Sequence, residues 1–330
     1  MNKLKRLFQS EQAVVLSFFL LLCIIIGILN PSKFFTINTL FDLLKNSIVP
    51  GILAIGVLII MIFGGVDLSF SAIGAFSSYV TIKLANLLFP NISLVVIFLI
   101  CILIGVFLGF INAILVSYSN LPILVVTLGT STMIYGFLLF FIDNKIIMDL
   151  PSKLSSFSKS SLISFQNEIG TSNLHTSILV LIILAAIISF IFNYMKTGRM
   201  IFAVGGGGRD LASRVGINVR NQDLIVFTLS GGIAALGGIC NASLFRYANP
   251  VIFRGDELDI IAAVVIGGAS ISGGKGSVLS TIIGVLLINL IKNNLIMIGI
   301  PSSWQKAIVG MIIIIGTSYN VYRARKSKQL

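Results

Sequence analysis

A glycine-rich stretch that ends in lysine is the part of the sequence most suggestive of chemistry. Residues 266–280 read IGGASISGGKGSVLS. A phosphate-binding P-loop requires G-x-x-x-x-G-K-[ST], in which backbone amides cradle phosphates and the last hydroxyl holds Mg²⁺. Here Ala269 stands where the first glycine belongs, and Gly276 replaces the hydroxyl residue after Lys275. The pattern argues against nucleotide binding.

Other side chains capable of catalysis or metal binding are sparse. The single histidine, His175, is not part of a recognisable nucleophile–base arrangement, and Cys23, Cys101 and Cys240 are spread through apolar stretches. An enzyme would need paired carboxylates, metal-ligating histidines or an activated nucleophile. We therefore predict no catalytic residue, no metal, no cofactor and no enzymatic activity.

Composition decides which elements must position the few polar groups. The chain has 330 residues, of which 56% are hydrophobic and 10% charged, whereas a soluble domain carries about 25% charged residues. A helix crosses the hydrocarbon with about 20 apolar residues. We predict an all-α polytopic membrane protein with about ten helices (roughly 8–10), several broken at glycine-rich junctions. The predicted spans are Ala13–Leu29, Ile48–Phe63, Leu68–Phe89, Ser93–Val116, Pro122–Phe141, Ser177–Asn193, Leu224–Cys240, Leu258–Ser270, Val278–Ile291 and Trp304–Tyr322.

The distribution of lysine and arginine predicts the orientation. These residues cluster at the N-terminus, between residues 196 and 220, and in the C-terminal tail. Cytoplasmic loops are enriched in positive residues, so we expect both termini inside and residues 142–176 to form an outer loop. Residues 1–330 then form a single transmembrane domain, and the net charge of +12 reflects membrane topology and not nucleic-acid binding.

Glycine-rich junctions separate the members of two pairs of predicted spans. The stretch from Leu258 to Ile291 is too long for one ordinary span, and we expect two short helices joined by a turn, with Ser277 capping the second. Asp67 follows Gly64 and Gly65 at the other junction. Either Asp67 caps the helix that begins at Leu68, with its carboxylate accepting from the amide of Ser69 or Phe70, or this junction borders a pathway for a polar solute; both interpretations are compatible.

The polar residues of these junctions and of the TLGTST segment (residues 127–132) are the candidates for a translocation pathway. Serine and threonine within a span commonly bond their own helix carbonyls, so their contact with a solute is an open alternative. The candidates are Gly64, Gly65, Asp67, Ser69, Phe70, Thr127, Thr130, Gly267, Gly268 and Ser270.

Residues 197–223 form the longest predicted cytoplasmic loop. Arginines alternate there with apolar residues, and Asp210–Val215 is predicted to be a short helix that stops at Gly216. This loop either lies on lipid headgroups or docks a soluble partner, with apolar side chains as anchors and arginines at the rim. The candidate coupling residues are Arg199, Arg209, Asp210, Leu211, Arg214, Val215 and Gly216.

A resemblance to a known family rests on several motifs in a fixed order. They are GGVDLS, VTLGTS, TGRMIFAVGG, GINV, LSGGIAALGGI, GDELDIIAAVVIGGASISGGKGS and WQKAIVGMIIII. Between Asn46 and Tyr322, the chain resembles the permease subunit of bacterial ABC importers of the ribose, xylose and galactose type.

The resemblance implies a multi-pass protein of the bacterial cytoplasmic (inner) membrane, embedded in membrane lipid, that works as a homodimer or with a second permease. A solute-binding receptor would deliver a monosaccharide or similar polyol, and a separate ATP-binding ABC subunit would hydrolyse ATP. Residues 197–223 match the family's ATPase-contacting segment, which favours docking over headgroup binding. Relatives that import rhamnose, autoinducer-2 or nucleosides share much of this pattern, so the motifs leave the solute open.

The sequence departs from the family pattern at two places. Gly205–Gly208 is followed by Arg209, apparently one residue later than in the family, and Phe70 and Ser71 replace a small residue pair. A stand-alone, ion-coupled secondary transporter is the alternative, because broken helices are typical of that class too. Such transporters place several ionisable groups inside the bundle, whereas Asp67 is nearly alone in the sequence around it.

Overall fold

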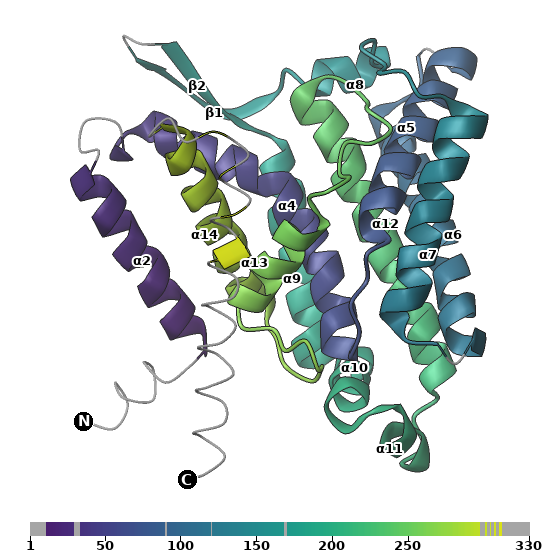
Figure 1. The fold of residues 1–330 in the computed structure, drawn as a ribbon. Coiled ribbons are helices and arrows are strands. Elements are labelled where there is room, and N and C mark those ends of the chain that lie inside the picture. Colours follow the sequence, from purple (N-terminus) through teal and green to yellow (C-terminus); the bar gives the residue numbers. More distant parts are fainter. Residues whose placement is uncertain are drawn as a thin grey trace, which may run out of the picture.

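The structure is a computed structural model that describes residues 11–29, 34–89, 91–119, 121–167, 170–297, 301, 304, 307, 310 and 311. It is mainly helical (Figure 1). The long helices are α2 (Glu11–Leu29), α4 (Ile37–Phe63), α5 (Phe70–Leu88), α6 (Leu94–Ser119), α7 (Ile123–Phe137) with the π-helix η1 (Leu138–Ile142), α9 (Ser177–Tyr194), α12 (Val219–Phe245) and α14 (Val278–Met297). The shorter helices are α8 (Ser152–Phe157), α10 (Lys196–Gly207), α11 (Arg209–Arg214) and α13 (Glu257–Ile266).

Every predicted span up to residue 297 contains a helix. Within the described residues, 6 helices are long and apolar enough to cross a membrane: α4, α6, α7 with η1, α9, α12 and α14. α13 has only 10 residues and begins after an irregular connection. The last predicted span, Trp304–Tyr322, lies largely outside the described residues.

The all-α prediction missed one element. Within residues 142–176, β1 (Ser161–Asn167) and β2 (Gly170–His175) form an antiparallel hairpin. Only chain inside the hydrocarbon is forced to satisfy all its backbone groups within helices or closed barrels, and no apolar periodicity marks this short hairpin. The remainder of the segment is anchored on α5, where Lys83 pairs with Asp143 at 2.8 Å. That hydrogen bond holds the pKa of Asp143 below its ordinary value.

Helix α4 lies at the centre of the molecule. In the most apolar 18-residue stretch of α4, 89% of the residues are buried. The helix packs against α9, α10, α12, α13 and α14. A helix that is hydrophobic on all sides is expected to be surrounded by other helices. α4 therefore forms the core against which the junctions are held.

Small residues allow α12 to pack closely against α5 and α6. A Cβ at Gly105 or Gly109 of α6 would overlap backbone atoms of α12, and one at Gly231 would lie 2.9 Å from the Cα of Gly109. On the other side of α12, Gly238 packs against Gly74 of α5. Close approach through small residues is the usual basis of helix association in membranes, which explains the LSGGIAALGGI motif in packing terms.

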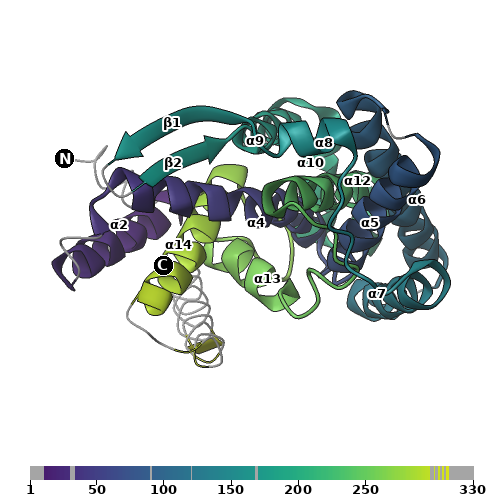
Figure 2. The same cartoon turned by 90° about the horizontal axis from the view of Figure 1, so that it is seen from above.

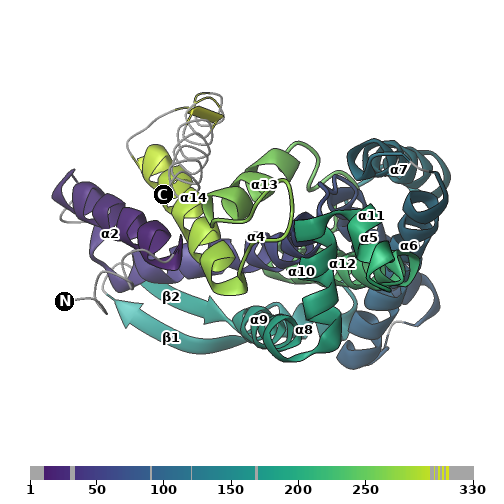
Figure 3. The ribbon, with the colours of Figure 1, turned by 90° about the horizontal axis from the view of Figure 1, so that it is seen from below.

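The molecule has two different ends. The β1–β2 hairpin and α8 lie at the upper end (Figure 1), and the view from above shows the hairpin along one edge of the bundle (Figure 2). Viewed from below, α10 and α11 lie at the opposite end, where they contact α4 and α12 (Figure 3). The predicted outer loop and the predicted coupling loop therefore lie at opposite ends of the bundle.

Candidate functional site

The glycine-rich junctions converge at the end of the bundle that carries α10. Gly64, in a left-handed conformation (φ 102°), ends α4. A Cβ at Gly273 would lie 2.8 Å from the Cα of Gly64 and 2.9 Å from the Cα of Gly205. The amide of Gly274 donates to the carbonyl of Ile62 at 2.8 Å. Three segments distant in sequence thus meet through bare backbone.

This contact explains the glycine-rich stretch of residues 266–280. α13 ends at Ile266, α14 begins at Val278, and the turn between them packs on α4 and α10. As predicted, Ser277 caps the second helix, because its hydroxyl accepts from the amide of Ser280 at 3.3 Å. The glycines permit close packing of backbones, and the side chain of Lys275 is exposed.

Asp67 lies in an irregular connection that is inside the protein. After α4 the chain turns back, so that α5 begins farther from α10 than α4 ends (Figure 1). Asp67 is 2% exposed, and its carboxylate accepts from the amide and the hydroxyl of Ser69, both at 2.6 Å. Asn112 of α6 donates to the same hydroxyl at 2.7 Å.

The predicted cap at Asp67 is therefore correct in its partner but not in its helix. The carboxylate binds the amide of Ser69 as expected, yet the helix starts at Phe70, with Ser69 as its N-cap residue. The reason is that Asp67 and Ser69 close a local turn of their own, which delays the first helical residue. Phe70, a pathway candidate, is 1% exposed and packs in the core.

The two threonine candidates occupy different surroundings. The hydroxyl of Thr127 accepts from the amide of Leu68 at 3.2 Å and lies 3.4 Å from the carbonyl of Val66, so α7 is tied to the connection. Thr130 instead donates to the carbonyl of Thr127 in its own helix at 3.2 Å. The structure brings Thr127 to Asp67 and leaves Thr130 as a helix-bonded residue.

The candidates in the second junction do not join Asp67. Gly267 caps α13 and packs against the backbone of Ser280 in α14. Gly268 has a positive φ of 94° and belongs to the same turn. The amide of Ser270 donates to the carbonyl of Lys275 at 3.1 Å. These residues shape the turn that reaches Gly64 and Gly205.

The predicted coupling loop is mostly helical. The short helix expected at Asp210–Val215 is α11, Arg209–Arg214, and Gly216 follows with a φ of 87°. Residues 196–207, which were expected to be loop, form α10, which packs on α4, α9 and α12. Arg199 is exposed and reaches the carbonyl of Tyr194 at 3.5 Å.

Helix α11 has an inner and an outer side. Ala212 is 3% exposed, whereas Leu211 and Val215 are 59% and 76% exposed. Asp210 and Arg214 are also exposed. Two large apolar side chains thus project from the end of the molecule beside charged neighbours, as a docking surface requires.

Arg209 points inward, contrary to its expected place at the rim. Its guanidinium binds Asp223 of α12 at 2.6 and 3.1 Å, and it lies 5.4 Å from the ring centre of Phe63. Ser117 of α6 donates to the same carboxylate at 3.0 Å. Asp223 is 0% exposed, and a buried carboxylate needs a paired charge. Arg209 therefore fastens α11 to the ends of α4, α6 and α12.

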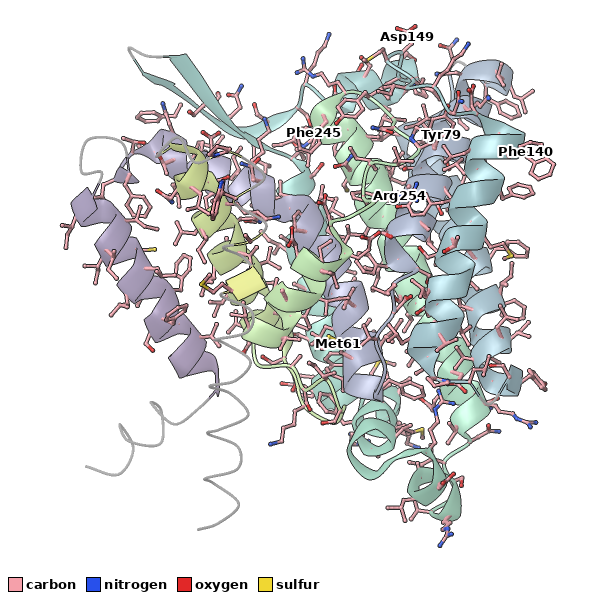
Figure 4. The ribbon with its side chains drawn as sticks, viewed as in Figure 1. Met61, Tyr79, Phe140, Asp149, Phe245 and Arg254 are labelled. Carbon is pink, nitrogen blue, oxygen red and sulfur yellow. The ribbon has the colours of Figure 1, made fainter. Side chains whose placement is uncertain are left out.

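A cavity that was not predicted from the sequence lies near the other end. Most of its wall is apolar, but nine of its lining residues carry polar side chains, and we call it the polar cavity for these residues. It has a volume of about 360 Å³ and is lined by residues of α4, α12, α13 and α14 and of the connection before α13. Figure 4 places Phe245, one lining residue, far from Met61, which is close to the glycine contact. The polar lining residues are Lys45, Asn46, Asn241, Tyr247, Asp256, Asp259, Asn289, Lys292 and Asn293.

A signal for this cavity was present in the sequence. Asn289 and Lys292 lie on or next to the predicted span Val278–Ile291, and Asp259 lies within the predicted span Leu258–Ser270. Charged and amide side chains within spans mark functional sites more often than lipid-facing surface. Lys292 pairs with Asp259 at 2.6 Å, but pairing between residues of different spans was not apparent from the sequence.

Comparisons with known proteins agree with the membrane-embedded architecture. Residues 39–316 match the family described as "Branched-chain amino acid transport system / permease component". The probable ABC transporter permease protein YphD of Escherichia coli (strain K12) is 33% identical over 91% of this chain and 87% of its own. The D-allose transport system permease protein AlsC of the same organism is 32% identical over 90% and 88%. The ribose import permease protein RbsC of Haemophilus influenzae is 30% identical over 94% of each chain. No solved structure matches.

The matched region, residues 39–316, begins in the first turn of α4 and extends beyond the end of α14. It contains the glycine contact, the Asp67 connection, the coupling helices and the polar cavity. The chain belongs to the family of transport-system permease components.

Proposed function

We propose that this chain is the membrane-spanning permease subunit of an ATP-driven, receptor-dependent importer of a monosaccharide or similar polar solute. The observation that carries the proposal is the match over 94% of both chains to a ribose import permease. Relatives named for D-allose and for galactose/methyl galactoside support the same solute class. The protein is a multi-pass protein of the bacterial inner membrane.

The division of work between subunits follows from the fold. Solute movement and nucleotide chemistry occur in different polypeptides, so force has to pass through a rigid contact. α11 presents Leu211 and Val215 outward while Arg209 binds Asp223 inside. We assign α10 and α11 to contact with an ABC ATPase subunit, with their end of the bundle in the cytoplasm.

The opposite end, which carries the β1–β2 hairpin, would face the solute-binding receptor. The connection around Asp67 and the turn Gly267–Ser270 would border the inner part of the solute pathway, because both reach Gly64 and α10. A second permease subunit, identical or different, would complete the transporter, with about ten spans per chain.

Reconstitution distinguishes the proposed function from ion-coupled transport. None of the relatives described above is named as an ion-coupled transporter. Proteoliposomes that contain the chain, its ATPase partner and the receptor should accumulate labelled D-ribose, D-allose or D-galactose when ATP is supplied. The chain alone should hydrolyse no ATP and accumulate no sugar under a proton or sodium gradient. Gradient-driven accumulation by the chain alone would establish the secondary-transporter alternative instead.

A further inference from the structure

The polar cavity contains a nearly buried amide without a protein partner. Asn241 of α12 lines the cavity and is 6% exposed. Its side chain makes no hydrogen bond to any residue that the structure describes. Buried amides in native proteins are almost always hydrogen-bonded, and each exception asks for an explanation. A molecule that enters the cavity can supply the hydrogen-bond partner that this amide lacks.

The charges around the cavity are balanced. Lys45 and Lys292 line it together with Asp256 and Asp259, and the ammonium of Lys292 lies 2.6 Å from the carboxylate of Asp259. A site for an anion or a cation would carry an excess of the opposite charge. The balanced lining instead suits a neutral ligand.

The remaining side chains suit a ligand with hydroxyl groups. Asn289 donates to the hydroxyl of Ser47 at 3.0 Å and to the carbonyl of Asn46 at 3.3 Å. Its amide oxygen accepts from no residue that the structure describes and is free to accept from a ligand. Amides donate and accept at once, as each hydroxyl does. Phe245, Tyr247 and Phe253 add apolar surface for carbon–hydrogen faces. The volume of about 360 Å³ is within the range of small-molecule sites.

We propose that this cavity binds the solute during import, and that Asn241 is a specificity-determining contact to a neutral, hydroxyl-rich small molecule. The inference rests on the proposed function. The cavity lies near the end that carries Phe245, whereas the glycine contact lies near Met61 (Figure 4). The solute thus has a binding site in the outer half of the chain before it reaches the Asp67 connection.

The missing partner of Asn241 gives a sharp test. Replacing an unpaired buried amide by an apolar side chain of similar shape is nearly neutral or stabilising for folding. Asn241→Leu should therefore leave the melting temperature of the purified permease–ATPase complex unchanged or raise it. The same variant should import sugar about fivefold to tenfold more slowly, as expected for loss of a hydrogen bond to the solute.

The matched control is Asn193→Leu, because Asn193 is exposed on α9 and bonds only the carbonyl of Ser189 in its own helix. It should transport at the wild-type rate. If Asn241→Leu lowers melting temperature and uptake together, Asn241 is structural and the inference is wrong. It is also wrong if uptake by this variant stays at the wild-type rate. If wild-type protein imports none of D-ribose, D-allose and D-galactose, the proposed function fails first and the inference fails with it.

A second variant reports binding directly. A water-soluble thiol reagent should modify Asn241→Cys in the full transporter, and the imported sugar should slow the modification where a sugar that is not imported does not. Wild-type protein gives the background, which comes mainly from half-buried Cys23, since Cys101 and Cys240 are buried. The assignment is wrong if the reagent does not modify Asn241→Cys, or if the imported sugar does not slow the modification. It is also wrong if anionic phospholipid vesicles alone slow the modification.

Discussion

At the scale of single residues, carboxylates inside the bundle are satisfied in two ways, by neutral hydrogen-bond donors or by a basic side chain. Asp67 accepts from Ser69, Asp223 is paired with Arg209, and Asp259 is paired with Lys292. A charge at membrane depth costs about 2.5–3.5 kcal/mol on insertion scales, so each needs a compensating partner. The kind of partner decides what a substitution does.

Asp67 is expected to act through hydrogen bonds and not through its charge. Asp67→Asn keeps an oxygen that accepts from Ser69, so we expect most uptake to remain. Asp67→Leu leaves the amide of Ser69 without this acceptor, which should cost about 1–3 kcal/mol and reduce the amount of folded protein. Uptake and membrane expression of both variants check this. Loss of transport in a well-folded Asp67→Asn protein would show that the carboxylate charge serves the pathway.

Arg209 and Asp223 should behave as a unit. Arg209→Ala leaves a buried carboxylate unpaired, which typically costs about 3–5 kcal/mol. Adding Asp223→Asn removes that charge, so the double variant should regain part of the lost melting temperature. Arg214→Ala, on the exposed side of α11, should change little. Melting curves together with receptor-stimulated ATP hydrolysis test this, and equal effects of Arg209→Ala and Arg214→Ala would contradict it.

At the scale of elements, the contact between α4, α10 and the turn before α14 is made by backbone. Gly205 is the most confined residue, since a Cβ there would lie 2.7 Å from the amide nitrogen of Gly274 and would overlap the carbonyl of Ile62. Two helices and a turn can shift there only together. This arrangement gives α10 a mechanical link to the end of α4.

Two glycines of α10 therefore differ in their tolerance of alanine. Gly205→Ala should separate the three segments and lower both melting temperature and transport. Gly207→Ala meets only the Cβ of Leu211 at 3.9 Å and should be neutral or stabilising by up to about 1 kcal/mol, the helix propensity gained. Thermal melting of the pair measures this. A neutral Gly205→Ala would mean that the contact is loose.

Helix α11 should couple the permease to its ATPase through its apolar side. Leu211→Glu or Val215→Glu places a charge where a groove on the partner needs an apolar anchor, and either change should abolish receptor-stimulated ATP hydrolysis. Both side chains are exposed, so folding and the binding of receptor should persist. Pull-down of the ATPase and vesicle assays check this. If both variants retain full receptor-stimulated ATP hydrolysis, the docking site lies elsewhere, and the turn around Lys275 is the next candidate.

The sequence predicted elements better than it predicted their contacts. Apolar runs located the helices, and glycine and Ser277 located the turn before α14, because these signals are local. The inward direction of Arg209, the helix α10 and the polar cavity were missed. The direction of Arg209 and the cavity depend on pairs of residues from different elements, such as Arg209 with Asp223 or Asp259 with Lys292. The helix α10 was missed because its run of glycines is unfavourable in a helix. Pairing between helices leaves no periodic signal in a chain whose spans are apolar on most sides.

At the scale of the whole molecule, the two sites to which we assign functions are separated along the bundle. The polar cavity lies near the end of α12 that carries Phe245 (Figure 4), and α10 and α11 lie at the other end (Figure 1). α4 and α12 extend between the two regions. Displacement of α11 by an ATPase can therefore reach the cavity through helices that contact both.

This arrangement predicts the orientation in the membrane. Lys159 in the segment before β1 and Ser213 in α11 are both exposed, and they belong to opposite ends of the bundle. The positive residues around α10 and α11 favour the cytoplasm. A membrane-impermeant maleimide should therefore modify Lys159→Cys in cells whose inner membrane is intact, and Ser213→Cys only after that membrane is permeabilised. Wild-type protein gives the background from its own cysteines. The reverse pattern would invert the topology, and labelling of both positions in intact cells would mean that these ends do not lie on opposite sides of the membrane.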